Sequence, residues 1–125
     1  MNVIELRLEI STPSQNDFHY AKHWSKARNI KAQMAKALLV AIGNSGNQQA
    51  MKAFGKRRLT VVRFGKRRAD VLNIAGGIKG LVDNLVGYGL LIDDDDRYFE
   101  LGSISNGTLR KGESPYTVII LEDVQ

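Results

Sequence analysis

The sequence contains no cysteine and only two histidines, His19 and His23. Without cysteine the chain cannot form a disulfide scaffold, a zinc–thiolate site, an iron–sulfur cluster or a thiol nucleophile. Two histidines are too few for most metal sites that are built from histidine. No apolar run approaches the roughly 18 residues of a membrane-spanning helix, and acidic residues stand where a signal peptide would be apolar. We therefore expect a soluble cytoplasmic protein with no membrane partner.

The composition is that of a globular protein. Hydrophobic residues make up 43% of the chain and charged residues 25%, values that exclude wholesale disorder. The 125 residues fit one domain, and the sequence shows no internal repeat, linker or low-complexity tract. We expect residues 1–125 to form a single domain.

Hydrophobic periodicity predicts four strands and two main helices in the order β-α-β-α-β-β. Apolar and charged residues alternate over residues 3–10, as in a half-buried strand, and apolar residues recur every four positions from Ile30 to Ile42, as in an amphipathic helix. The predicted strands are residues 3–10, 57–64, 97–104 and 116–122, and the predicted helices are residues 25–42, ended by Gly43, and 73–88, capped by Gly89. Turns at 106–107 and 111–112 join the last two strands. This order predicts a compact α+β domain with a mixed sheet.

Basic and acidic residues occupy different parts of the chain, whose net charge is +5. Between Asp17 and Asp70, 13 of 52 residues are Lys or Arg and none is acidic. From Asp70 to Glu100, seven acids face only Lys79 and Arg97. A protein that hydrolyses a polyanion with a metal ion needs such a division, because basic residues neutralise phosphates and carboxylates hold the cation. A solvated basic face beside an acidic loop gives the same composition, so charge alone leaves both interpretations open.

The most specific pattern lies in residues 66–97, which read KRRADVLNIAGGIKGLVDNLVGYGLLIDDDDR. The residues that carry it are Asp70, Asn73, Gly76, Gly77, Lys79, Asp83, Leu85, Gly89, Asp93 and Asp94. An earlier segment contributes Pro13, Ser14 and Asn16, followed by His23 and Trp24. Together they resemble the Asp-x-Asp-Asn box, Lys-bearing helix, Asp-x-Leu and Asp-Asp pair of RusA-type crossover junction endodeoxyribonucleases, the small Holliday junction resolvases of phages and prophages.

The resemblance implies a metal-dependent endodeoxyribonuclease that resolves four-way DNA junctions by paired symmetric nicks, in recombination and repair. The implied cofactor is Mg²⁺, with Mn²⁺ as a possible substitute, and Mg²⁺ prefers hard oxygen ligands. Asp70 and Asp94 are the first-choice ligands and catalytic residues, and Asp93 is the next. Lys79 would stabilise charge on the phosphate or protonate the leaving group, and Asn73 would orient a ligand or cap a helix.

Each of these residues also has an ordinary structural interpretation. Asp70 is well placed to cap the second helix, and Lys79 and Asp83 have the i, i+4 spacing of a surface ion pair. The four acids of residues 93–96 are compatible with a solvated turn, although a bound cation would offset the repulsion among them. The spacing of these residues alone does not choose between structure and catalysis.

One departure from the family pattern occurs at Leu72, where the box usually carries a second Asp. If that Asp is an essential ligand, metal affinity suffers here. Asp95 or Asp96 would then supply the missing oxygen, or the second Asp is not essential in this branch, or the protein binds junctions but cuts them poorly. Leu72 therefore favours an alternative function, a non-catalytic or impaired branched-DNA-binding protein.

Basic residues near the motif and near the first helix are the predicted DNA contacts. They are Lys66, Arg67, Arg68, Lys22, Lys26 and Arg28. Contacts of this kind would be made to phosphates and would be sensitive to salt. The aromatic residues Phe18, Tyr20 and Trp24 would stack on unpaired bases or serve as core anchors, the second being the commoner fate of such residues.

The expected partners are a four-way DNA junction and a second copy of the chain, and no small-molecule substrate is expected. Two symmetric cuts require two active sites, which implies a homodimer. A helix over residues 73–88 would be about 24 Å long, whereas residues 89–93 return at most ~17 Å. Asp70 and Asp94 therefore meet within one chain only if the helix is shortened, and otherwise meet across the dimer. The resemblance places such a protein in the cytoplasm of a bacterial host, encoded by a phage or prophage.

Overall fold

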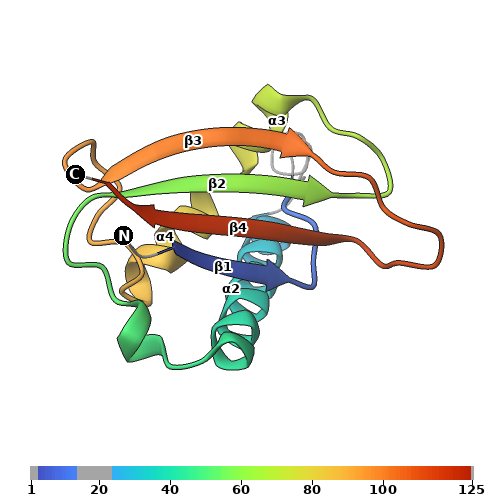
Figure 1. The fold of residues 1–125 in the computed structure, drawn as a ribbon. Coiled ribbons are helices and arrows are strands. Elements are labelled where there is room, and N and C mark those ends of the chain that lie inside the picture. Colours follow the sequence, from blue (N-terminus) through green and yellow to red (C-terminus); the bar gives the residue numbers. More distant parts are fainter. Residues whose placement is uncertain (1–2, 14–23, 125) are drawn as a thin grey trace.

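The computed structural model of the chain describes residues 3–13 and 24–124, with side chains from residue 28 onward in the second range. The elements are β1 (Val3–Leu8), α2 (Trp24–Ser45), the 3-10 helix η1 (Gln48–Met51), β2 (Arg57–Phe64), α3 (Val71–Gly77), α4 (Lys79–Gly87), β3 (Phe99–Asn106) and β4 (Tyr116–Asp123). They form a four-stranded mixed sheet with helices against it (Figure 1). The predicted α+β fold class is confirmed.

The strands lie in the order β1-β4-β2-β3. β4 is antiparallel to both β1 and β2, and β3 is parallel to β2. A parallel pair needs a long crossover connection, which α3 and α4 provide between β2 and β3. The last strand of the chain therefore lies between the first two, and β3 and β4, although consecutive in sequence, are not neighbours.

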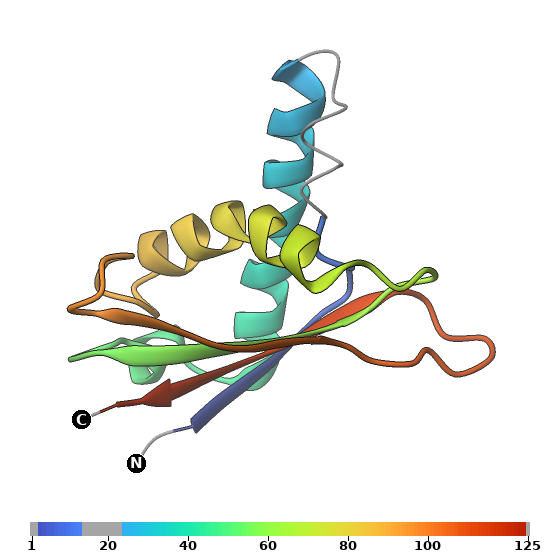
Figure 2. The ribbon, with the colours of Figure 1, turned by 90° about the horizontal axis from the view of Figure 1, so that it is seen from above.

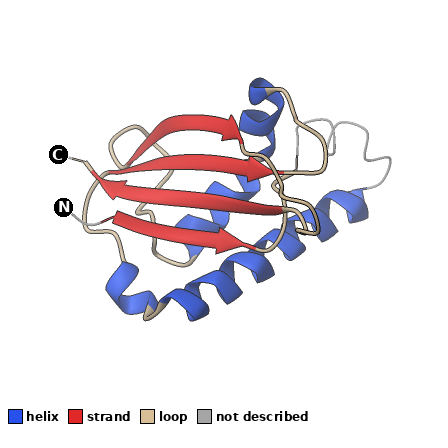
Figure 3. Ribbon diagram, turned by 45° about the vertical axis from the view of Figure 1, so that its right-hand side comes forward, coloured by secondary structure: helices blue, strands red, loops and turns tan. Residues whose placement is uncertain are grey.

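One face of the sheet carries the core. Alternate residues of the strands point to this face and are fully buried, and they are Leu6, Leu8, Leu59, Val61, Ile119 and Leu121. They pack against apolar side chains of α2 and α4 such as Leu38, Ile42 and Leu85. Figure 2 and Figure 3 show that α2, α3 and α4 lie on the same side of the sheet. This packing buries the alternating positions that the sequence pattern indicated.

The second helical segment differs from the predicted single helix over residues 73–88. It consists of α3 and α4, which meet at Ile78, where φ is −91° and ψ is 2°. Gly76 and Gly77 precede this break, and glycine disfavours helix by about 1 kcal/mol relative to alanine. Ile78 is only 4% exposed, so the interruption is anchored in the core. The helical periodicity of the sequence continues across the break, so the glycine pair at 76 and 77 is the local signal for it.

The predicted cap at Gly89 is present, but Gly43 does not end the first helix. Gly89 has φ +84° and follows the last turn of α4. Its amide donates to the Val86 carbonyl at 3.0 Å, and the next amide donates to the Leu85 carbonyl at 2.9 Å, which is the Schellman arrangement. α2 continues through Gly43 to Ser45, and the left-handed residue that follows it is Gly46, with φ +137°.

Candidate active site

The acidic loop, residues 93–96, connects α4 to the start of β3. The carbonyl of Asp95 accepts hydrogen bonds from the amides of Tyr98 at 3.0 Å and Phe99 at 2.8 Å. The carboxylate of Asp95 accepts the Arg97 amide at 2.9 Å and pairs with the Arg97 guanidinium at 3.0 Å. This contact with Arg97 lowers the pKa of Asp95. Asp95 therefore shapes the turn that leads into β3.

Lys79 contacts the acidic loop from the first turn of α4. Its ammonium lies 2.7 Å from Asp94 Oδ2 and 3.3 Å from Asp83 Oδ1. The hydrogen bond to Asp94, followed by the one to Asp83, raises the pKa of Lys79. The hydrogen bond from Lys79, followed by one with Asp93, lowers the pKa of Asp94. The structure thus brings Lys79, Asp94 and Asp83 together, so the surface pair and the contact between two predicted catalytic residues are both present.

A cavity of about 210 Å³ adjoins this ion pair. Ala75, Ile78 and Val82 from α3, α4 and the break between them line it together with two side chains of β3, and Lys79 and Asp94 are its charged members. A larger cavity of about 310 Å³ lies between β1 and α2 and is lined by none of the predicted site residues. The smaller cavity is the relevant one because it borders the predicted chemistry.

Asp70 is the N-cap of α3, and its Oδ1 accepts the Leu72 amide at 2.9 Å. The preceding residue, Ala69, is held by Asn106 at the end of β3, through hydrogen bonds of 3.1 Å and 2.8 Å. Asp94 instead precedes the beginning of β3. The eight residues of this strand span roughly 25 Å. Within one chain Asp70 therefore lies at the end of β3 and Asp94 before its start, and the break at Ile78 does not bring them together.

Leu72 and Asn73 both lie in α3. The Leu72 side chain is 77% exposed, which excludes it from the core. An acid at this position would stand on the surface next to Asp70. Asn73 does not cap the helix, since Asp70 does so, and its side chain is half-buried.

The basic residues of the motif lie on the side of Asp70. Lys66, Arg67 and Arg68 are exposed on the connection from β2 to α3. Arg63 shapes this connection, because its guanidinium donates to the Arg67 carbonyl at 3.0 Å and to the Thr12 carbonyl at 2.9 Å. These three predicted DNA contacts are thus separated from the acidic loop by the length of β3.

The remaining predicted contacts lie near the N-terminus of α2. Arg28 is exposed on this helix. Lys26 belongs to α2, but its side chain lies outside the described residues, as does that of Trp24. Lys22, together with residues 14–23 as a whole, lies outside them too.

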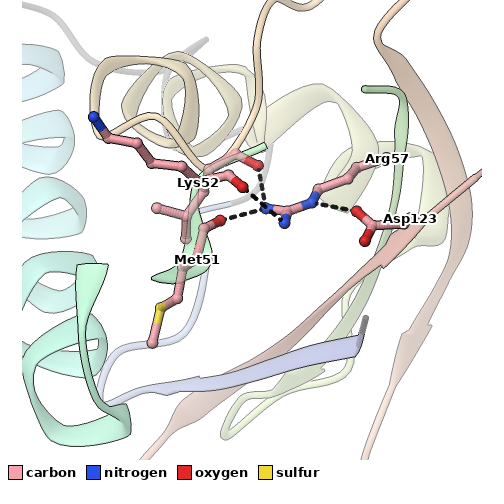
Figure 4. A network of polar contacts seen from close by, with 5 residues as sticks. Met51, Lys52, Arg57 and Asp123 are labelled. Atoms are coloured by element: carbon pink, nitrogen blue, oxygen red, sulfur yellow. Dashed lines mark hydrogen bonds and ion pairs between the residues drawn. The ribbon is translucent and has the colours of Figure 1, made fainter. Parts of the chain in front are cut away.

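Two residues that support the site were not identified from the sequence. The sequence predicts Asn106 as a turn residue, but its side chain fixes the backbone before Asp70. Arg57 is 2% exposed, and its guanidinium donates to the carbonyls of Met51 at 2.6 Å and Leu90 at 2.9 Å, close to the acidic loop. Figure 4 shows how the Arg57 side chain reaches both the η1 segment and Asp123. A charged residue at an inward-facing strand position was the available signal for Arg57.

No protein-family model matches the chain, and no curated protein matches it either.

Over residues 3–13 and 24–124, no group of three or more acidic or histidine residues has the arrangement of a metal site. None of the helices in the described part of the chain is long and apolar enough to cross a membrane.

Proposed function

We propose that the protein is a metal-dependent endodeoxyribonuclease that resolves four-way DNA junctions as a homodimer. The observation that carries the proposal is the contact between Lys79 and Asp94, two residues 15 positions apart whose side chains meet at 2.7 Å on the surface. Both belong to the segment that resembles the RusA-type motif, and the resemblance assigns both to catalysis. The exposed basic connection before Asp70 adds a surface suited to phosphates.

The carboxylates present suit a magnesium ion. Asp93 and Asp94 are exposed on the acidic loop and offer the hard oxygen ligands that Mg²⁺ prefers, with room for the waters that it retains. Mg²⁺ held there would stabilise charge on the scissile phosphate and activate a water molecule. Asp93 and Asp94 would hold the ion in one chain, and Asp70 would complete the ligand set.

Lys79 is suited to electrostatic stabilisation of the bound phosphate. The Lys79 ammonium is protonated at neutral pH like that of any exposed lysine, its contacts with Asp94 and Asp83 raise its pKa further, and it therefore carries a positive charge beside Asp94. A general acid works best with a pKa near the operating pH, and a raised lysine pKa moves away from that condition. Of the two roles that the resemblance left open for Lys79, we therefore favour charge stabilisation.

Two chains would build each site. Asp70 and Asp94 lie at opposite ends of β3, whereas ligands of one ion must converge to within a few ångströms. A site that uses both residues takes Asp70 from one subunit and Asp94 from the other. Such sharing would make cutting depend on dimer formation, and a two-fold dimer carries two sites, one for each strand to be nicked.

Cleavage of a labelled synthetic four-way junction, with and without Mg²⁺, tests the proposal. We expect paired symmetric nicks from the wild type and no nicks from Asp70→Asn or Asp94→Asn. Junction binding by both variants should be unchanged or tighter, because losing a carboxylate removes repulsion toward phosphate. Glu5→Gln, an exposed carboxylate on β1, is the matched control and should cut like the wild type. Normal cutting by either Asn variant would refute the ligand assignment.

A subunit-mixing experiment tests the shared site separately. Heterodimers of Asp70→Asn and Asp94→Asn chains would contain one intact site if the sites are shared, and would nick one strand. If each site lies within one chain, both sites are broken and the mixture stays inactive. Native mass spectrometry must confirm the heterodimers, and an inactive confirmed heterodimer would disprove sharing.

Leu72 favours a second candidate function, a branched-DNA-binding protein without cleavage. This exposed leucine stands where the resemblance expects an acid, next to Asp70. Leu72→Asp should change the unfolding free energy by less than about 0.5 kcal/mol, because the side chain is on the surface. If the site is otherwise assembled, the same change should tighten Mg²⁺ binding and raise cutting. A wild type that shifts the junction without cutting it in Mg²⁺ or Mn²⁺ would establish the binding protein instead.

A further inference from the structure

Two loops leave the sheet at one end, and the residues at their ends are in contact with each other. They are the first basic loop, residues 65–69 after β2, and the second basic loop, residues 107–115 between β3 and β4 (Figure 1). The rings of Phe64 and Tyr116 stack at 4.3 Å between centroids. The Gly107 amide donates to the Arg63 carbonyl at 2.8 Å. These contacts fix where the second basic loop begins and ends relative to the first.

Gly107 allows the close approach of the two loops where they leave the sheet. A Cβ atom at this position would overlap the ring of Phe64, so no other residue fits without displacement of that ring. The guanidinium of Arg7 lies 3.7 Å above the ring of Tyr116 and extends the stack to β1. This packing orients both loops before any ligand binds. Preorganisation of this kind lowers the entropic cost of binding one ligand with both loops.

The second basic loop presents Arg110 and Lys111 at a tight turn. The Glu113 amide donates to the Arg110 carbonyl at 3.1 Å, and Gly112 has φ +86°, as the third residue of a type II turn requires. The Glu113 carboxylate accepts the backbone amide of Arg110 at 2.7 Å. Glu113 thus holds the turn through the backbone, and the Arg110 guanidinium has no ion pair with any residue in the described part of the chain.

The cations of both loops are exposed and lack ion pairs with the residues that the structure describes. The five residues are Lys66, Arg67, Arg68, Arg110 and Lys111. Of the cations on the strands, by contrast, Arg7, Arg57 and Arg58 are each paired with a carboxylate, and Arg63 is held by two backbone carbonyls. Unpaired positive charge concentrated on two preoriented loops is typical of a surface that binds a regularly spaced polyanion.

We propose that the second basic loop is a DNA-backbone contact of its own, in which Arg110 and Lys111 bind phosphates of the same duplex arm that the first basic loop holds. The ligand class is the phosphate backbone of double-stranded DNA, and this choice of polyanion rests on the proposed function. The contact is independent of base sequence, because the loop offers charges and no fixed hydrogen-bonding edge.

Salt-dependent binding tests the assignment. The double variant Arg110→Gln, Lys111→Gln is compared with wild type on a fluorescent four-way junction and on a linear duplex, between 50 and 200 mM salt. Loss of two phosphate contacts should make the plot of log affinity against log salt concentration less steep by about 2 units. Between these two salt concentrations the affinity of the variant should therefore fall about tenfold less than that of wild type. Neutralising residues 66–68 should flatten the slope by about two to three units from a wild-type value near −5.

The matched control removes two lysines from the opposite end of the sheet. Lys52→Gln, Lys56→Gln changes the net charge equally, so a slope like that of wild type shows that position matters. If the Arg110, Lys111 variant also keeps the wild-type slope, the inference is overturned, and the nuclease proposal stands as long as wild type still cuts junctions. If wild type binds neither DNA at 50 mM salt, both are overturned. An RNA duplex of equal length that competes better than DNA would overturn the choice of DNA.

Discussion

Arg57 offers the most quantitative prediction, because its guanidinium links four segments of the chain. The side chain is 3% exposed. Its Nη1 donates to the carbonyls of Met51 and Leu90, its Nη2 to the carbonyl of Lys52 at 3.3 Å, and its Nε to Asp123 Oδ1 at 2.9 Å. Replacing Arg57 by methionine keeps an unbranched side chain in the space and removes every one of these donors.

The expected loss of stability follows from the groups left behind. The carbonyls of Met51 and Leu90 are bonded to Arg57 in buried surroundings, and a buried acceptor deprived of its donor costs about 1–3 kcal/mol. Asp123 is 39% exposed and regains water, so its lost ion pair adds less than about 1 kcal/mol. We expect Arg57→Met to reduce the free energy of unfolding by about 3 kcal/mol, which is a large part of the usual 5–15 kcal/mol.

Urea unfolding followed by circular dichroism measures this loss. With an m-value of about 2 kcal/mol/M, the midpoint should fall by about 1.5 M, and Tm should fall by about 10 °C. Arg58→Met is the matched control, because Arg58 lies on the same strand and pairs with Glu100 but is 40% exposed. That variant should lose less than about 1 kcal/mol. An Arg57→Met protein within about 1 kcal/mol of wild type would refute the reasoning.

Two further predictions concern the ion pair and the glycines. Lys79→Met should raise the pKa of Asp94 toward its ordinary value in an NMR titration, because the hydrogen bond from Lys79 is the main cause of the lowered pKa, and an unchanged pKa would disprove the contact. Because the folded-state pKa of Asp94 is lowered, the ion pair stabilises the protein at neutral pH, and this stabilisation is lost as the pH falls through that pKa. Gly43→Ala should stabilise the protein by up to about 1 kcal/mol, since the site lies inside a helix with free space, whereas Gly89→Ala should destabilise it by about 1 kcal/mol because of its left-handed backbone. Thermal unfolding of both variants checks the opposite signs.

Patterns that act over a few residues were predictable from the sequence. The alternation in residues 3–10 and the strand at residues 57–64 follow from the two-residue period, which the burial of Leu6, Leu8 and Leu59 reproduces. Gly89 was predictable as a cap because a left-handed residue is needed after a helix, and glycine meets that need without strain. Such features depend on neighbours in the chain and on the sidedness of helices and strands.

Contacts between distant residues were decided by the tertiary structure. No local sequence pattern predicts that β4 inserts between β1 and β2, because strand pairing depends on which sheet edges remain available after the other elements pack. The contact of Lys79 with Asp94 depends on how α4 and the acidic loop are held against β3. The separation of Asp70 from Asp94 likewise follows from the length and direction of β3.

The candidate site divides along the same line. The sequence by itself determined which residues have the chemistry, since carboxylates, a lysine and a basic run stand in one segment whatever the fold. Adjacency in the chain placed the basic run beside Asp70, whereas only the tertiary structure decided that the acidic loop lies at the other end of β3 and that the loop of Arg110 and Lys111 leaves the sheet beside the basic run. The physical reason is that charged groups interact through space over several ångströms, whereas their order in the chain follows no structural period. The sequence therefore shows how many charged residues there are, and the sheet determines where they lie.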